Sequence, residues 1–326
     1  MDVPQLTKTV HKAAYPSIDP ANPKLSAAGK TIIISGGAGG IGFAIAQGFC
    51  IAGAARVIIL ARRQEALDEA ASKLSYENEA TERRTEIWTY LLDMKDTIAS
   101  EKVFNTIRAR LNEGQKNGDE VVDADILILS AANLAQGKTS LEFDPAVYRE
   151  AFETNVIGNL NLVRAFLAPE IPGIPFTTLG GVKKDVSSVP TPKHKKTILD
   201  ISSIAAYFDL SGQGPYSTTK LAFTRAMKTL QIEVDLIEGQ PIRIHSFHPG
   251  AIWTPGAAST LPESIREIFS FDDISLPQGF AVWLASAEAE FLKGRFLFSS
   301  WDVDELIALK DVFAADPNFG TITLKQ

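Results

Sequence analysis

A tyrosine and a lysine four positions apart are the side chains of this sequence best suited to move a proton. Tyr216 and Lys220 share one face of an expected helix, because positions i and i+4 are neighbours on a helix surface. A free tyrosine phenol has a pKa of about 10, and a nearby ammonium favours the phenolate. Ser203, at the end of an expected strand, could hydrogen-bond the same substrate oxygen. We therefore predict acid–base catalysis, although Tyr-x-x-x-Lys pairs also occur in helices without a catalytic role.

A glycine-rich stretch near the N-terminus is suited to bind phosphate. Residues 32–34 are an apolar run typical of a strand buried on both faces of a parallel sheet, and a segment that suits a helix begins at residue 43. Between them, Ser35-Gly-Gly-Ala-Gly-Gly-Ile-Gly42 would present backbone N–H groups and a helix N-terminus to a pyrophosphate. A turn without a ligand is the alternative, but the strand and helix around it favour a dinucleotide site.

Strands and helices alternate along the rest of the chain and must position these residues. Strands are expected at residues 32–34, 56–60, 86–92, 125–129, 197–201, 242–247 and 295–298. Helices are expected at residues 43–49, 64–74, 98–111, 148–167, 215–236, 279–288 and 302–313. The alternation predicts an α/β fold: a Rossmann-type, doubly wound parallel sheet of seven strands with helices on both faces. Ligands of such sheets bind beyond the carboxyl ends of the strands.

We expect one domain with several additions. Residues 1–29, rich in Pro and Ala, are expected to form an arm lying over a single domain of residues 30–326. Residues 169–196 are too long for an ordinary connection, so we expect an insertion at the surface. Residues 255–275 are expected to form a mobile segment with a short helix, and residues 300–326 a C-terminal extension.

Composition and charge exclude several classes of function. The 326 residues are 45% apolar, which indicates a globular protein. A net charge of −7 without a long basic run argues against a nucleic-acid partner. Cys50 is the only cysteine and the four histidines are scattered, so neither a disulfide nor a metal site is expected. No stretch suits a signal peptide or a membrane span, so we expect no membrane association and a cytoplasmic location.

The order of these motifs resembles the single-domain branch of the short-chain dehydrogenase/reductase family, and in particular its fungal members, over about residues 30–300. The resemblance implies an oxidoreductase with four catalytic residues. Tyr216 would be the acid in reduction and the base in oxidation, and Ser203 would polarise the reacting oxygen. Lys220 would lower the tyrosine pKa and bind the nicotinamide ribose. Asn155, otherwise an ordinary polar helix residue, would hold a water that connects Lys220 to solvent.

The implied cofactor site extends over several strand ends. Asp93 would bind the adenine amino group, with a helix N-cap as the alternative role. Thr254 and the backbone of Ile252 would bind the carboxamide. The expected cofactor-binding residues are Ser35, Gly36, Gly40, Ile41, Gly42, Arg62, Arg63, Asp93, Met94, Ala131, Tyr216, Lys220, Pro249, Gly250, Ile252 and Thr254. The sequence departs from the family after the fourth strand, where Ser130-Ala-Ala-Asn133 replaces Asn-Asn-Ala-Gly, and inter-strand hydrogen bonds are expected to be lost or moved to Ser130.

The end of the second strand indicates the cofactor. A carboxylate there would select NAD by binding the ribose 2′-hydroxyl. This sequence has Ala61, followed by Arg62 and Arg63, and arginine binds phosphate through two parallel hydrogen bonds. We therefore predict NADP(H) rather than NAD(H), with two solvated surface arginines as the alternative.

The predicted activity is hydride transfer between the cofactor and a bulky apolar or aromatic carbonyl or alcohol, such as a secondary metabolite. Its expected apolar walls are Tyr207, Phe208, Pro255, Leu261, Ile265, Ile268, Phe269 and Phe271, although these residues could equally be lid packing. Two other functions stay open: a cofactor-binding sensor or interaction module without redox turnover, and a related site that performs dehydration or cyclisation. The resemblance also implies a homodimer or homotetramer, paired through the helices at 148–167 and 215–236.

Overall fold

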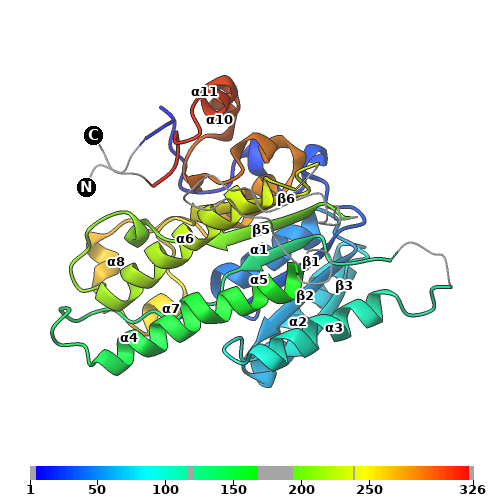
Figure 1. Ribbon diagram of the computed structural model, residues 1–326, viewed down its shortest axis with the longest axis horizontal. Coiled ribbons are helices and arrows are strands. Elements are labelled where there is room, and N and C mark those ends of the chain that lie inside the picture. Colours follow the sequence, from blue (N-terminus) through cyan, green and yellow to red (C-terminus); the bar gives the residue numbers. More distant parts are fainter. Residues whose placement is uncertain (1–4, 117–120, 168–193, 238, 323–326) are drawn as a thin grey trace.

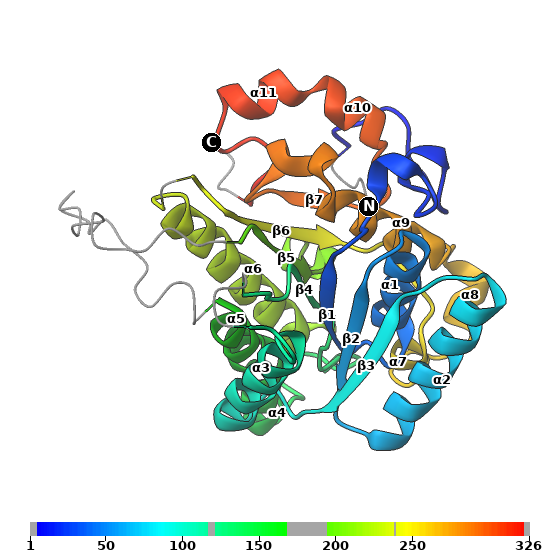
Figure 2. The same ribbon diagram turned by 90° about the vertical axis from the view of Figure 1, so that its right-hand side faces the viewer.

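Seven apolar runs of the sequence form the strands of one parallel sheet. The computed structural model describes residues 5–116, 121–167, 194–237 and 239–322. The strands lie in the order β3-β2-β1-β4-β5-β6-β7; Figure 1 shows the sheet from one side, and Figure 2 also labels β4 and β7. They are β1 Thr31–Ser35, β2 Arg56–Ala61, β3 Glu86–Leu91, β4 Ile126–Leu129, β5 Lys196–Ile201, β6 Ile242–His248 and β7 Phe296–Phe298. This confirms the predicted seven-stranded sheet, whose strand order reverses between β1 and β4, the place where such sheets bind ligands.

Helices cover both faces of the sheet (Figure 2). One face carries α1 Gly40–Ile51, α2 Gln64–Ala80 and α9 Ser275–Ala285, and the other carries α3 Thr97–Leu111, α5 Asn159–Leu167 and α6 Gly214–Val234. Every residue of β1, β4 and β5 is buried. The central strands are therefore enclosed on both sides, as their continuous apolar sequences predict.

Two expected helices are divided in the structure. The segment predicted as one helix over 148–167 consists of α4 Pro145–Phe152, a wide π-type turn Glu153–Gly158, and α5. Within this turn the Asn155 carbonyl accepts a hydrogen bond of 2.9 Å from the Asn159 side-chain amide. The helix expected at 302–313 is two short ones, α10 Val303–Ala308 and α11 Lys310–Ala315, which meet at Leu309. Hydrophobic spacing alone does not reveal either break, because the apolar faces continue across it.

The N-terminal arm packs between α9 and the C-terminal helices (Figure 2). Ile18 is fully buried, and Gly279 of α9 allows this contact because a side chain there would collide with the Ile18 carbonyl. The Tyr15 hydroxyl accepts a hydrogen bond of 2.7 Å from the backbone N–H of Val303. The arm is thus continuous with the core of the sheet domain. The insertion expected at 169–196 lies outside the described residues except for its last three, of which Lys196 begins β5.

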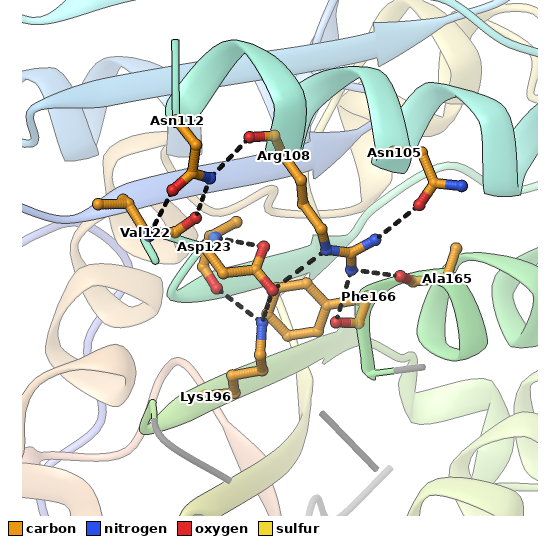
Figure 3. Close-up of polar contacts among 9 residues, drawn as sticks. Asn105, Arg108, Asn112, Val122, Asp123, Ala165, Phe166 and Lys196 are labelled. Atoms are coloured by element: carbon orange, nitrogen blue, oxygen red, sulfur yellow. Dashed lines mark hydrogen bonds and ion pairs between the residues drawn. The ribbon is translucent and has the colours of Figure 1, made fainter. Parts of the chain in front are cut away.

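A buried ionic cluster joins α3, β5 and the end of α5 (Figure 3). The Lys196 ammonium and the Arg108 guanidinium both bind Oδ2 of Asp123, at 2.8 and 3.2 Å. Arg108 also donates hydrogen bonds to the carbonyls of Ala165 and Phe166 at 2.6 and 3.1 Å, where the last turn of α5 lacks helical partners. Burial raises the pKa of Asp123, but the two cations outweigh burial and hold that pKa below its usual range. The cluster fixes the ends of three elements.

The described helices include none that is both long enough and apolar enough to cross a bilayer.

Candidate active site

A cavity of about 1600 Å³ opens at the carboxyl ends of the strands and collects residues that follow six of them. All but two of the site residues predicted from the sequence line this cavity. Those that line it are Ser35, Gly36, Gly40, Ile41, Arg62, Arg63, Asp93, Met94, Ala131, Ser203, Tyr216, Lys220, Pro249, Gly250, Ile252 and Thr254. Gly42 and Asn155 are not among the residues that line the cavity.

The turn between β1 and α1 exposes bare backbone to the cavity. Gly36 has a left-handed φ of +67°, and a Cβ there would lie 2.9 Å from the Ala131 nitrogen. A side chain on Gly42 would collide with the Gly36 carbonyl, so Gly42 lets the helix pack against the turn. Gly39 faces open space and precedes the first turn of α1 without a side-chain cap. The free N–H groups of this helix start therefore fit a pyrophosphate, and the cavity fits the remainder of a dinucleotide.

Ser35 connects β1 to the loop after β4. Its hydroxyl oxygen accepts hydrogen bonds from the backbone N–H groups of Ser130 and Ala131 at 3.1 and 3.3 Å. The connection between these strand ends thus comes from the Ser35 side chain, where the sequence had suggested Ser130.

Tyr216, Lys220 and Ser203 converge on the cavity from two neighbouring elements. Lys220 is 5% exposed; its Nζ donates a hydrogen bond of 2.7 Å to the Ile201 carbonyl and lies 5.8 Å from the centre of the Tyr216 ring. Ser203 precedes a short 3₁₀ turn, Ile204–Ala206, and its Oγ accepts a hydrogen bond of 3.1 Å from the Ala205 N–H. Because Oγ is the acceptor in that bond, its O–H stays available to donate to another oxygen.

Asn155 lies in the wide turn after α4 and reaches two other elements. Its Oδ1 accepts the Asn133 N–H at 2.6 Å, and its Nδ2 lies 3.0 Å from the Asn133 carbonyl and 2.9 Å from the Thr219 hydroxyl. Thr219 precedes Lys220 on α6, so this amide holds the loop after β4 against the helix that carries Tyr216 and Lys220. A bridging water held by Asn155 stays a prediction.

The expected adenosine-binding residues follow the carboxyl ends of β2 and β3. Arg62 and Arg63 are exposed where α2 begins and line the cavity. Asp93 accepts the Lys95 N–H at 3.1 Å, whereas the N-terminus of α3 is capped by Asp96. Asp93 therefore bonds the short turn that precedes α3 but does not cap the helix itself, and it lines the cavity.

The apolar wall differs in part from the expected one. Pro255, Leu261, Ile265, Phe269 and Phe271 line the cavity as predicted, together with Leu134 and Leu210. Ile268 is 87% exposed, and neither Tyr207 nor Phe208 lines the cavity. Tyr207 instead stacks on Phe296 of β7, with ring centres 6.4 Å apart. Sequence reasoning could assign apolar character to this segment but not the direction of each side chain.

Three lining or supporting residues escaped the sequence analysis. The Ala251 N–H donates to the Asp272 carboxylate at 2.8 Å, and the Asp272 N–H donates to the Ala251 carbonyl at 2.8 Å. Burial raises the pKa of the Asp272 carboxyl. Lys12 of the arm reaches the cavity and donates a hydrogen bond of 2.7 Å to the Ser270 hydroxyl. His248, the last residue of β6, also lines the cavity. None of them has a spacing or motif that marks it in the sequence.

Comparisons with known proteins agree with this geometry. Residues 30–171 match the family model for short chain dehydrogenases. A short chain dehydrogenase/reductase of Aspergillus novofumigatus is 30% identical over 98% of this chain and 97% of its own length. Another, of Aspergillus aculeatus, is 32% identical over 98% of this chain and 96% of its own length.

Solved structures share the fold. One is a short chain dehydrogenase from Shigella flexneri in complex with NADP, with a TM-score of 0.65 and 20% identity, covering 85% of this chain and 99% of that one. L-sorbose reductase from Gluconobacter frateurii, in complex with NADPH and L-sorbose, has a TM-score of 0.65 and 23% identity, covering 84% of this chain and 96% of that one. With the near full-length relatives, these likenesses lead to one conclusion: the chain belongs to the short-chain dehydrogenase/reductase family and is an NAD(P)-dependent oxidoreductase.

Proposed function

We propose that this enzyme is an NADP(H)-dependent ketoreductase or secondary-alcohol dehydrogenase that acts on bulky apolar or aromatic carbonyl compounds, such as secondary metabolites. The observation that carries the proposal is that Ser203, Tyr216 and Lys220 line the same cavity as the bare glycine turn before α1. A phenol, a hydroxyl and an ammonium beside a dinucleotide site are the groups that carbonyl reduction requires.

Each side chain has a separate task in this proposal. When bound, the nicotinamide supplies the hydride in reduction and takes it in oxidation. The Tyr216 phenol gives a proton to the substrate oxygen in reduction and removes it in oxidation. The free O–H of Ser203 donates a hydrogen bond to that oxygen and polarises the carbonyl. Lys220 keeps two of its three N–H donors after bonding Ile201, enough to hold the nicotinamide ribose.

The preference for NADP(H) is supported by the charges at the end of β2. Ala61 offers no carboxylate to a ribose 2′-hydroxyl, while Arg62, Arg63 and Lys73 all line the cavity. Two acids also line the cavity: Glu69, which is bound to Lys73 at 2.7 Å, and Asp93, which is expected to bind the adenine. Arg62 and Arg63 are therefore the two cations proposed to bind the 2′-phosphate. The solved relatives with NADP and NADPH bound show that this fold accepts the phosphorylated cofactor.

The apolar wall supports a bulky apolar substrate, because seven apolar side chains line this part of the cavity: Leu134, Leu210, Pro255, Leu261, Ile265, Phe269 and Phe271. Association into a dimer or tetramer is supported by apolar side chains left exposed on the segment from α4 to α6. They are Phe152, Ile157, Leu221 and Ile232, with exposed fractions of 38%, 43%, 45% and 57%.

The test is consumption of NADPH with a panel of aromatic ketones, with the product identified by mass. Tyr216→Phe is expected to abolish reduction while the protein still binds NADPH. Tyr207→Phe is the matched control, because it removes the same hydroxyl from a tyrosine outside the cavity. Reduction that survives in Tyr216→Phe would eliminate the proposed acid. A product that has lost water without NADPH consumption would indicate dehydration, and tight cofactor binding without any turnover would indicate a sensor.

A further inference from the structure

The His248 imidazole is hydrogen-bonded to the turn that carries Ser203. Its Nδ1 lies 3.1 Å from the backbone nitrogen of Ile204, the residue that follows Ser203. A backbone N–H can only donate, so Nδ1 must accept and carries no proton. The proton of the neutral ring is therefore on Nε2, and a doubly protonated ring could not make this bond.

The surroundings of His248 keep the ring neutral and fixed. Burial lowers the pKa of His248 to about 4, so the acceptor is present throughout the neutral range. The ring meets Phe298 of β7 edge to face, with centres 5.4 Å apart. The His248 carbonyl accepts the Ser299 N–H at 2.9 Å, which holds the backbone at the end of β6.

The first two N–H groups of the 3₁₀ turn after β5 each donate to a different side-chain acceptor. His248 takes the N–H of Ile204, and Ser203 Oγ takes the N–H of Ala205 at 3.1 Å. The second bond orients the Ser203 hydroxyl with its O–H directed away from the turn. On one side of Ser203, β6 holds the backbone through the Phe247 carbonyl, which accepts the Ser202 N–H at 2.9 Å. On the other side it does so through the His248 imidazole, so the orientation of the Ser203 hydroxyl depends on His248 for the second of these two attachments.

We propose that His248 is a positioning residue: through Nδ1 it holds the Ile204 N–H, and with it the turn from which Ser203 presents its hydroxyl to the substrate oxygen. The inference rests on the function proposed above, and it assigns His248 no contact with the substrate. Loss of the acceptor should slow the chemical step, because an unpaired N–H lets the turn shift and Ser203 Oγ move with it.

Two substitutions of His248 distinguish the effect of losing the hydrogen-bond acceptor from the effect of losing the aromatic ring. His248→Phe keeps an aromatic ring against Phe298 but removes the acceptor, while His248→Asn removes the ring and places an amide oxygen near the position of Nδ1. We expect kcat for ketone reduction to fall roughly tenfold to a hundredfold in His248→Phe, the loss caused by one unpaired N–H. In His248→Asn we expect kcat to stay within about threefold of the wild type, because the hydrogen bond is kept. The dissociation constant for NADPH should be unchanged in both variants.

Hydrogen exchange of the Ile204 amide gives a second readout that needs no turnover. Protection is expected in the wild type and in His248→Asn, and its loss in His248→Phe. A His248→Phe variant with wild-type kcat, or a His248→Asn variant as slow as His248→Phe, would overturn the proposal. If the wild type reduces no carbonyl compound, the proposed function fails, and equal Ile204 protection in all three proteins would then overturn the positioning role on its own.

Discussion

Asn155 and Asn133 hold each other through two hydrogen bonds, although 22 positions separate them. The Asn155 side chain accepts the Asn133 N–H at 2.6 Å and donates to the Asn133 carbonyl at 3.0 Å, as a neighbouring strand would. A further bond of 2.9 Å reaches the Thr219 hydroxyl on α6. One amide, 1% exposed, therefore ties the loop after β4 to the helix of Tyr216 and Lys220.

Replacing Asn155 by Ala should weaken both folding and catalysis. The Asn133 N–H and carbonyl, which are partly buried, would lose their partners, which costs about 1–3 kcal/mol of unfolding free energy. The rate of ketone reduction should fall too, because Thr219 adjoins Lys220. Chemical denaturation and steady-state kinetics measure the two effects. Thr219→Val removes one of the three Asn155 bonds and the bond of 2.8 Å from the Thr219 hydroxyl to the Tyr216 carbonyl, but it keeps both bonds between Asn155 and Asn133, so it should cause a smaller loss. An Asn155→Ala variant as stable as the wild type would contradict this account.

Sequence reasoning located the elements of this site because its strongest signals are local. The glycine run after an apolar strand and the i, i+4 pair of Tyr216 and Lys220 depend on neighbours in the chain, and the structure places them on one cavity. The pairing of Asn155 with Asn133 depends on a turn that widens inside a continuous apolar pattern, so spacing could not reveal it.

Contacts between segments that are distant in the chain could not be predicted either, because local spacing carries no information about them. His248 meets Ile204 only because β6 lies beside β5 in the sheet. Lys12 reaches Ser270 because the arm packs on α9, which no periodic pattern in the arm foretells. The sequence predicts which side chains lie at the carboxyl ends of the strands, but their hydrogen-bond partners depend on tertiary packing.

Arg62 should select the phosphorylated cofactor. Arg62→Ala is expected to raise the dissociation constant for NADP by roughly tenfold to a hundredfold, the loss of a charge-assisted phosphate contact, and to leave that for NAD unchanged. Fluorescence titration with both nucleotides measures the two constants. Arg266→Ala is the matched control, because Arg266 does not line the cavity. An unchanged preference for NADP in Arg62→Ala would exclude Arg62 as the residue that recognises the phosphate.

Asp123 should be among the most sensitive positions for stability. Lys196 is 1% exposed, so Asp123→Asn would leave its ammonium buried without a counter-charge (Figure 3). The expected cost is about 3–5 kcal/mol of unfolding free energy, measured by chemical denaturation at neutral pH. The pKa of Asp123 is lowered in the folded state, so its contribution is present above the unfolded pKa and is lost as the pH falls through the folded one.

The control for Asp123 is an ion pair at the surface. Glu263 binds Arg266 at 2.6 Å, but both side chains are more than half exposed, so Glu263→Gln should have no measurable effect. Equal effects of the two substitutions would show that the buried cluster contributes no more than a solvated pair.

His245 should make the protein less stable in weak acid. It is fully buried in β6, its Nδ1 lies 3.1 Å from the Leu292 carbonyl, and burial with the charge of Arg243 lowers the pKa of His245 to about 3. As the pH falls below about 6.5 the unfolded chain binds a proton that the folded chain refuses, so stability decreases. Between pH 7 and pH 5 this one residue should cost about 2 kcal/mol of unfolding free energy.

The substitution His245→Asn isolates that loss, because an asparagine amide can still donate to the Leu292 carbonyl but does not titrate. Urea denaturation at pH 7 and pH 5 should show the variant losing about 2 kcal/mol less than the wild type over this interval, whatever its stability at pH 7. His11→Asn is the control, since His11 lies in the N-terminal arm, partly exposed and bound to Asp302 at 2.8 Å, and not in the core of the sheet. An identical pH dependence in His245→Asn and the wild type would mean that His245 takes up its proton in the folded protein as readily as in the unfolded chain.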